Sequence, residues 1–197
     1  MKSYDREYFD RWYREPSTRI VSRTELRRKV GLAVGVTEYF LRRPLENVLD
    51  LGCGEAPWRA ELKKLRPRVD YLGVDPSDYV VERYGHARDI VNGSFGSVAS
   101  LDLEPNFDLV ICSDVMHYIA DDELRKGIAT LAALADGVAY LDVLTADDDI
   151  VGDLDGLIRR PAAWYRAEFE AAGFAFAGPH CWLSPTMQDG LSRLEIG

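Results

Sequence analysis

The chain has 197 residues, of which 47% are hydrophobic and 29% are charged, and its formal net charge is −9 at pH 7. This length and composition fit a single globular domain and exclude a disordered or fibrous protein. The acidic balance makes a nucleic-acid partner unlikely, because contacts to phosphates need clustered Lys and Arg. The basic segment 1–43, with eleven Lys and Arg against six Asp and Glu, keeps that alternative open.

The cysteines and the N-terminus bear on where the protein works. The three cysteines lie far apart and form no CxxC pair, so we expect no disulfide. Met1 is followed by charged residues rather than an apolar stretch, and no window approaches eighteen apolar residues. We therefore expect a cytoplasmic protein without a signal peptide or a membrane span.

The N-terminal segment 1–23 is rich in aromatic and basic residues, and Pro16 interrupts any helix there. We expect it to be distinct from a domain at 24–197. It would act either as a lid that folds over a pocket and excludes water, or as an amphipathic helix packed on the edge of the sheet. Ser22–Glu25 has the pattern of a capping box and predicts a helix that ends near Leu41.

Beyond this helix, apolar runs alternate with helical patterns, which indicates a parallel sheet with right-handed crossovers. The predicted strands are 47–51, 71–74, 90–91, 107–114 and 138–144, and the predicted helices are 58–65, 78–84, one that Asp121 caps, and one from Pro161 to Gly173. Two closing strands, 174–182 and 191–196, are predicted around a turn at Ser184-Pro185. The fold class is α/β, Rossmann-like and doubly wound: a mostly parallel seven-stranded sheet with helices on both faces and a C-terminal antiparallel strand pair.

A pocket is predicted where the first two strands end. Asp50 and Asp75 lie at the carboxyl ends of these strands, where such sheets bind their ligands. The glycines of Gly52-Cys53-Gly54 let the backbone approach a ligand closely. Pro57 replaces the third glycine of a dinucleotide fingerprint, and the acid at Asp50 suits an ammonium group better than a pyrophosphate. A ligand with a ribose and an amino acid fits better than NAD, so an NAD-linked oxidoreductase is the lesser alternative.

With these residues the sequence resembles the class I S-adenosylmethionine (SAM)-dependent methyltransferases over about residues 24–196. Val48–Gly54 resembles the first motif of the family, with Ala56 where a further glycine is usual. Asp75 matches the acid that ends the second strand, and Phe107–Ile119 is similar to the fourth-strand motif of small-molecule members. The resemblance implies methyl transfer to O or N of a small molecule, with S-adenosylhomocysteine (SAH) as the product. The alternative is a SAM-binding regulatory or partner protein of the same fold without catalysis.

The resemblance also implies which residues hold the cofactor. Asp50 would bind the amino group of SAM, Asp75 the ribose hydroxyls, and the glycine turn the methionine end. Ser94 occupies a position where the family often has an acid that binds adenine. One of the N-terminal arginines, Arg14, Arg19 or Arg23, could pair with the SAM carboxylate. The expected cofactor-binding set is Asp50, Gly52, Cys53, Gly54, Asp75, Ser94, Phe95, Ser113, Arg19 and Arg23.

Two residues after the fourth strand are candidates for catalysis. His117 could be a general base, or it could line the pocket or pack under a lid. Asp114 could bind the substrate, a metal, or the N-terminus of the following helix. The acidic run Asp147–Asp149 could join Asp114 in holding Mg²⁺, could receive a cationic amine, or could be a solvated loop. No set of metal ligands is assigned, and the spacing of His180-Cys181-Trp182 argues against zinc.

Overall fold

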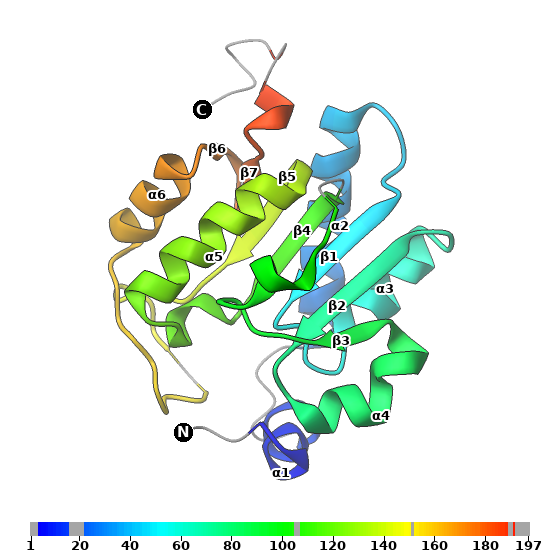
Figure 1. The fold of residues 1–197 in the computed structure, drawn as a ribbon, viewed down its shortest axis with the longest axis vertical. Helices are drawn as coiled ribbons and strands as arrows, with labels where there is room; N and C mark the ends of the chain where they lie inside the picture. Colours follow the sequence, from blue (N-terminus) through cyan, green and yellow to red (C-terminus); the bar gives the residue numbers. More distant parts are fainter. Residues whose placement is uncertain (1–3, 16–21, 105–106, 151, 189–190, 192–197) are drawn as a thin grey trace.

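The computed structural model describes residues 4–15, 22–104, 107–150, 152–188 and 191. Within these residues, seven strands form one sheet in the order β3-β2-β1-β4-β5-β7-β6, with helices on both faces (Figure 1). The strands β1 to β5 are parallel to one another. β7 runs antiparallel to β5, and β6 runs antiparallel to β7. The parallel strands are β1 (Asn47–Leu51), β2 (Asp70–Asp75), β3 (Ile90–Asn92), β4 (Phe107–Ser113) and β5 (Ala135–Asp142). The predicted fold class is confirmed.

The predicted helices begin within one residue of the expected positions, but one predicted capping residue is wrong. The helices are α1 (Arg6–Phe9), α2 (Arg23–Leu41), α3 (Pro57–Leu65), α4 (Asp78–Arg88), α5 (Asp121–Leu134) and α6 (Ala162–Ala171), with a π-helical turn η1 (Asp10–Arg14) and 3₁₀ turns η2 (Val98–Leu101), η3 (Met116–Tyr118) and η4 (Thr186–Gln188). Ser22 caps α2 by accepting a hydrogen bond from Glu25 N, as predicted. Asp121 is not the cap of α5, because Ala120 precedes the helix and the Asp121 carboxylate binds the buried guanidinium of Arg160.

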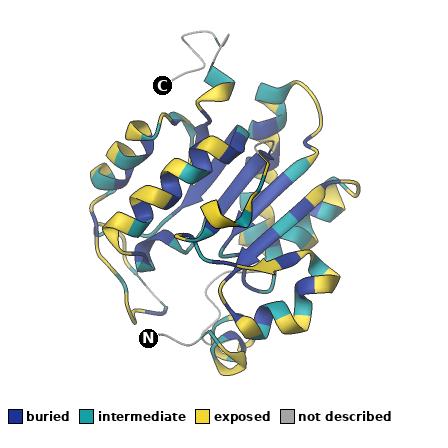
Figure 2. Ribbon diagram, viewed as in Figure 1, coloured by how far each residue is buried: buried dark blue, intermediate teal, exposed yellow. Residues whose placement is uncertain are grey.

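The sheet divides the apolar core into two layers. In β4, Leu109 and Ile111 pack with residues of α2 and α3, whereas Val110 and Cys112 pack with residues of α5 and α6. This alternation follows from the two-residue period of a strand. Because both faces are covered, the central strands are buried throughout while the outer surfaces of the helices are exposed (Figure 2).

The closing strands differ from the prediction in their boundaries. β6 (Ala175–Gly178) and β7 (Cys181–Leu183) form a hairpin over 175–183, where a single strand was predicted over 174–182. The chain can reverse there because Gly178 and His180 adopt positive φ angles of 153° and 58°. Of the predicted strand 191–196, Leu191 is not in a strand and residues 192–196 lie outside the described residues. The antiparallel pair exists, but it is formed by other residues.

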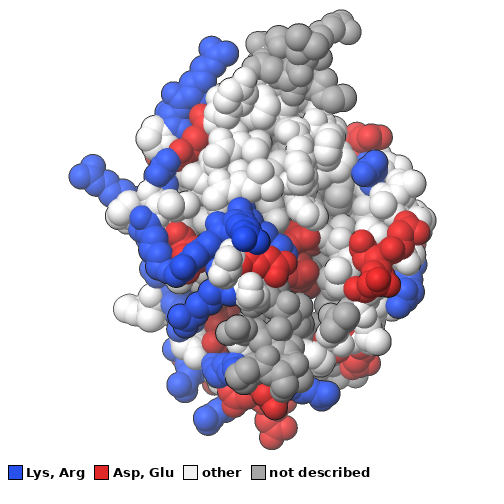
Figure 3. All heavy atoms as spheres, turned by 180° about the vertical axis from the view of Figure 1, so that it is seen from behind, with Lys and Arg blue, Asp and Glu red and all other residues white. Residues whose placement is uncertain are grey.

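Positive side chains on the face opposite α5 lie beside carboxylates (Figure 3). Arg66 on the α3–β2 connection pairs with Glu38, and Arg27 and Lys64 pair with Glu61 at 3.3 and 2.6 Å. Much of the basic character of the N-terminal half is thus neutralised locally. No helix in the described part of the chain is long and apolar enough to cross a membrane.

Candidate active site

The glycine turn after β1 has the geometry that its sequence predicts. Gly52 and Gly54 have φ angles of 69° and 52°, which glycine adopts without a steric penalty. A Cβ at Gly52 would lie 2.3 Å from a methyl group of Val115, so this position admits no side chain. Ala56, which stands where a glycine was expected, also has a positive φ of 55°. The turn therefore keeps its shape at Ala56 at a strain of about 1 kcal/mol.

Asp75 at the end of β2 ties this turn to the next connection. Its two carboxylate oxygens accept hydrogen bonds from Gly54 N at 2.8 Å and Ser77 N at 2.9 Å. The residue is only 6% exposed. Burial raises the pKa of Asp75, and the two backbone hydrogen bonds oppose that rise. Asp75 thus holds the turn through contacts within the chain.

Asp50 at the end of β1 is a second buried acid. It accepts a hydrogen bond of 2.7 Å from the hydroxyl of Tyr71 and is 2% exposed. Burial raises the pKa of Asp50 to about 7, so the group is divided between its two protonation states at neutral pH. A nearby ammonium group would favour the ionised form.

A cavity of about 520 Å³ opens beside this turn. It is lined by seven of the predicted site residues: Arg23, Asp50, Gly52, Cys53, Ser113, Asp114 and His117. Gly54, Asp75, Ser94 and Phe95 do not line it. Ser94 instead accepts a hydrogen bond from Ser97 N, and Phe95 packs against α5 at Gly127. Arg19 lies outside the described residues.

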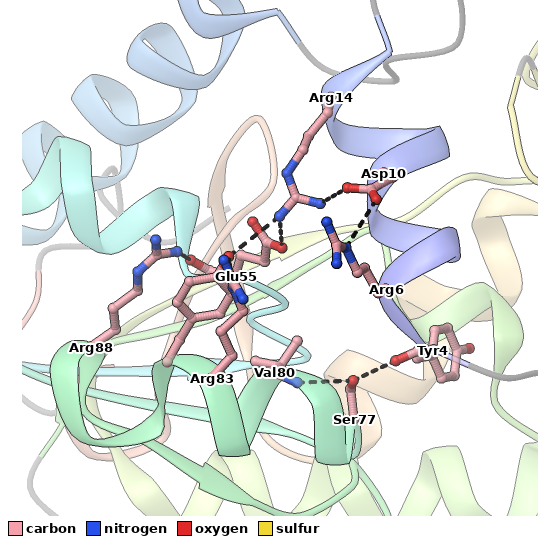
Figure 4. Close-up of polar contacts among 10 residues, drawn as sticks. Tyr4, Arg6, Asp10, Arg14, Glu55, Ser77, Val80, Arg83 and Arg88 are labelled. Carbon is pink, nitrogen blue, oxygen red and sulfur yellow. Dashed lines mark hydrogen bonds and ion pairs between the residues drawn. The ribbon is translucent and has the colours of Figure 1, made fainter.

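The N-terminal segment covers the turn at Gly54 and also forms part of the cavity wall through Tyr8, Trp12 and Tyr13. A Cβ at Gly54 would lie 3.3 Å from the ring of Phe9 and 3.5 Å from the hydroxyl of Tyr13. The same segment is held by polar contacts to the loops after β1 and β2 (Figure 4). It therefore packs at the carboxyl ends of the strands rather than along an edge of the sheet.

A charged cluster at the ends of β4 and β5 contains two residues that the sequence did not single out, Lys29 and Asp142. Lys29 Nζ lies 2.5 Å from Asp142 Oδ2 and 4.0 Å from Asp114 Oδ2. The hydroxyl of Ser113 lies 3.1 Å from Asp142 Oδ2. Asp142 also faces His180, whose Nδ1 is 3.4 Å from Oδ1.

Within this cluster, Asp114 is the carboxylate turned toward the cavity. Burial and the nearby Asp142 raise the pKa of Asp114 to about 6, and Lys29 opposes the rise. Asp114 also has a positive φ of 61°, a conformation that costs free energy in a residue other than glycine. The arrangement thus presents to the cavity a carboxylate that can exchange a proton near neutral pH.

His117 is buried and belongs to the same wall. Its Nδ1 accepts a hydrogen bond of 3.3 Å from Leu144 N. In the neutral ring this leaves the proton on Nε2, so the imidazole presents a donor rather than a base at that atom.

The acidic run Asp147–Asp149 does not support the Mg²⁺ hypothesis. The carboxylate of Asp148 accepts hydrogen bonds from Thr145, and no group of three metal-binding side chains exists among the described residues.

These features together define an enzyme class. A glycine turn, acids at the ends of neighbouring parallel strands, and a cavity beside them form a nucleotide-type site in a Rossmann-like sheet. A family of methyltransferase domains matches residues 11–186. The chain belongs to this methyltransferase family, in agreement with the predicted resemblance to class I SAM-dependent methyltransferases.

Solved structures agree on the fold. The chain is similar to an O-methyltransferase family protein from Burkholderia thailandensis, with a TM-score of 0.53 and 19% identity over 80% of this chain and 55% of that one. It is also similar to the [4+2]-cyclase SpnF, with a TM-score of 0.59 and 18% identity over 83% of this chain and 62% of that one. A third similar structure is the sugar N-methyltransferase KedS8 from Streptoalloteichus, with a TM-score of 0.61 and 20% identity over 79% of this chain and 84% of that one.

The chain thus spans 55% and 62% of the lengths of the first two structures. At these identities the likeness establishes the fold alone, and one of the three carries the name of a cyclase rather than a methyltransferase. No curated protein sequence matches the chain.

Proposed function

We propose that the protein transfers the methyl group of SAM to an oxygen or nitrogen atom of a small molecule. The observation that carries this proposal is that Asp50 at the end of β1 and Gly52 of the glycine turn line the same cavity as Asp114 and His117. The first pair would hold the amino-acid end of the cofactor. The second pair would receive the methyl acceptor.

On the cofactor side, each proposed role follows from charge. The Asp50 carboxylate would bind the ammonium group, and this contact would favour its ionised form. Arg23 lines the cavity and has no ion pair with any described residue, so it can offer a guanidinium fork to the carboxylate. Asp75 would accept hydrogen bonds from the ribose hydroxyls, and Ser94 and Phe95 would border adenine. The bound sulfonium would supply an electrophilic methyl group.

On the acceptor side, the chain has to position a nucleophile and remove a proton where one is present. Asp114 is suited to take that proton, because its pKa of about 6 lies near physiological pH. His117, with its proton on Nε2, would donate a hydrogen bond that orients the acceptor. An amine or a hydroxyl would fit this pair. The paired charges on the opposite face favour a small molecule over a nucleic acid, and a cytoplasmic location stays a prediction.

Calorimetric titration of the protein with SAH, and separately with NADH, tests the proposal. Micromolar binding of SAH without binding of NADH is the expected result. Binding of NADH alone would overturn it. Tight SAH binding without turnover over a broad panel of amines, phenols and alcohols would favour a regulatory SAM-binding protein instead.

A further inference from the structure

Residues 4–15 cover the part of the site where the proposed ribose ligand, Asp75, lies. We infer that in this conformation the segment occupies the adenosine half of the SAM site and has to leave before SAM can bind fully. The inference rests on the proposed function. It makes the N-terminal segment an intramolecular plug that competes with the cofactor, rather than a roof that forms over bound cofactor.

The first argument concerns Gly54. A glycine with a positive φ in this turn leaves a bare backbone face that a ligand can approach. In the structure the ring of Phe9 and the hydroxyl of Tyr13 fill that face, at 3.3 and 3.5 Å from the position of a Cβ. Phe9 is only 2% exposed. A ribose and this aromatic ring cannot share the same space.

The second argument concerns the loop after β2. The hydroxyl of Ser77 donates a hydrogen bond to the carbonyl oxygen of Tyr4, and Phe9 stacks on Tyr79 with ring centroids 5.8 Å apart and planes 28° apart. Ser77 lies two residues after Asp75 and caps α4, and Tyr79 lies in the first turn of that helix. The segment thus contacts the turn and the post-β2 loop at once, as a nucleoside bound to Asp75 would.

The third argument concerns how far the cavity extends, since Tyr8, Trp12 and Tyr13 of the segment form part of its wall. The cavity includes Asp50 and Gly52 but neither Gly54 nor Asp75. Both carboxylate oxygens of Asp75 already bind backbone N–H groups, and the residue is nearly inaccessible. The amino-acid end of SAM has room in this conformation, and the nucleoside end does not.

The ion pairs that hold the segment on the glycine loop are weak enough to break when the segment leaves. Arg14 binds Asp10 within the segment and Glu55 on the glycine loop, and the three side chains are 40%, 48% and 15% exposed (Figure 4). Partly exposed ion pairs contribute little and are screened by salt. The main contact is therefore the buried ring of Phe9, with Arg14 as a weaker clasp.

A plug lowers the apparent affinity in proportion to the fraction of open molecules. Weakening it should raise that fraction and hence the rate at which cofactor associates. The test is stopped-flow association of SAH with the full chain, followed by tryptophan fluorescence, because Trp58 lines the cavity. The variants are Phe9→Ala and Arg14→Ala. Glu7→Ala is the matched control, since Glu7 is exposed on α1 and has no described contact to the turn.

We expect the association rate to rise about tenfold in Phe9→Ala, which corresponds to about 1.4 kcal/mol in the closing equilibrium. Arg14→Ala should raise it severalfold, and added salt should accelerate the wild type but not this variant. Glu7→Ala should match the wild type. Arg14 is partly exposed, so its variant tests the inference even if Phe9→Ala fails to fold.

Two other results are informative. An unchanged association rate with faster SAH dissociation in both variants would mean that the segment is a roof over bound cofactor, and the plug would be refuted while the proposed function stands. Absence of SAH binding in the wild type and in both released variants would refute the proposed function, and the plug with it.

Discussion

Replacement of Asp75 by alanine is expected to destabilise the protein even without a cofactor. The carboxylate joins the glycine turn to the post-β2 loop through hydrogen bonds from Gly54 N and Ser77 N. Alanine would leave both donors unpaired in a site that is nearly closed to water. A single substitution therefore probes a structural contact and, in the presence of SAH, the proposed ribose contact.

The magnitude follows from the two bonds and from the burial of the charge. A hydrogen bond to a charged group contributes about 1.5–3 kcal/mol. Because burial raises the pKa of Asp75 despite these bonds, removal of the carboxylate also removes a desolvation cost. We expect a net loss of about 2–3 kcal/mol in the free energy of unfolding for Asp75→Ala, and about half of that for Asp75→Asn, which keeps one acceptor oxygen.

Urea unfolding of the cofactor-free protein measures this loss. Asp70→Ala is the control, because Asp70 is an exposed acid on the same strand and should change stability by less than about 0.5 kcal/mol. A second series adds SAH at 100 times its dissociation constant, which should stabilise the wild type by about 2.7 kcal/mol. Unchanged stability of Asp75→Ala without SAH would refute the structural reasoning. If SAH raises the free energy of unfolding of Asp75→Ala as much as it raises that of the wild type at the same SAH concentration, the proposed ribose contact is refuted.

Three further predictions concern the cavity walls. Asp50 stays protonated up to about pH 7 in the folded protein but only up to about pH 3.8 in the unfolded chain, so its contribution to stability falls as pH rises between these values. Asp50→Asn should therefore be more stable than the wild type at pH 8, by up to about 4 kcal/mol, but not at pH 4. Urea unfolding at both pH values would test this. Lys29→Met leaves Asp114 and Asp142 without their shared cation, and should cost about 1–3 kcal/mol at pH 8 and less at pH 5; equal losses at both pH values would contradict the coupling. His117→Ala leaves Leu144 N without its partner and should lower the melting temperature, whereas His117→Asn can restore an acceptor and should lower it less.

The sheet and its glycine turn were predictable because they depend on local patterns. The apolar runs that alternate with helical patterns and the spacing of Gly52 and Gly54 are set by neighbouring residues, and the structure keeps both. The position of the N-terminal segment was not predictable in the same way. Its packing on Gly54 joins residues more than forty positions apart, and the aromatic content of the segment is compatible with a lid or with a helix on the sheet edge.

The boundary of β5 shows how a small error in a predicted strand can conceal a residue of the candidate site. Asp50 and Asp75 attracted attention because each ends a predicted strand, and Asp142 ends β5 in the same way. The apolar pair Val143-Leu144 extended the predicted strand past Asp142, whereas in the structure the carbonyl of Asp142 accepts a hydrogen bond from Asp114 N and the strand stops there.

That stop brings Asp142 beside Ser113, its partner in the β4–β5 register, and within reach of Lys29 on α2. Lys29 itself gives no local signal, because its contact spans 113 residues and a lysine on an amphipathic helix is ordinarily solvated. Only the folded structure distinguishes Lys29, because there it lies near two carboxylates at the ends of neighbouring strands. Burial and Asp142 raise the pKa of Asp114, and Lys29, from a helix that precedes the glycine turn, limits that rise and thereby affects the proposed acceptor chemistry.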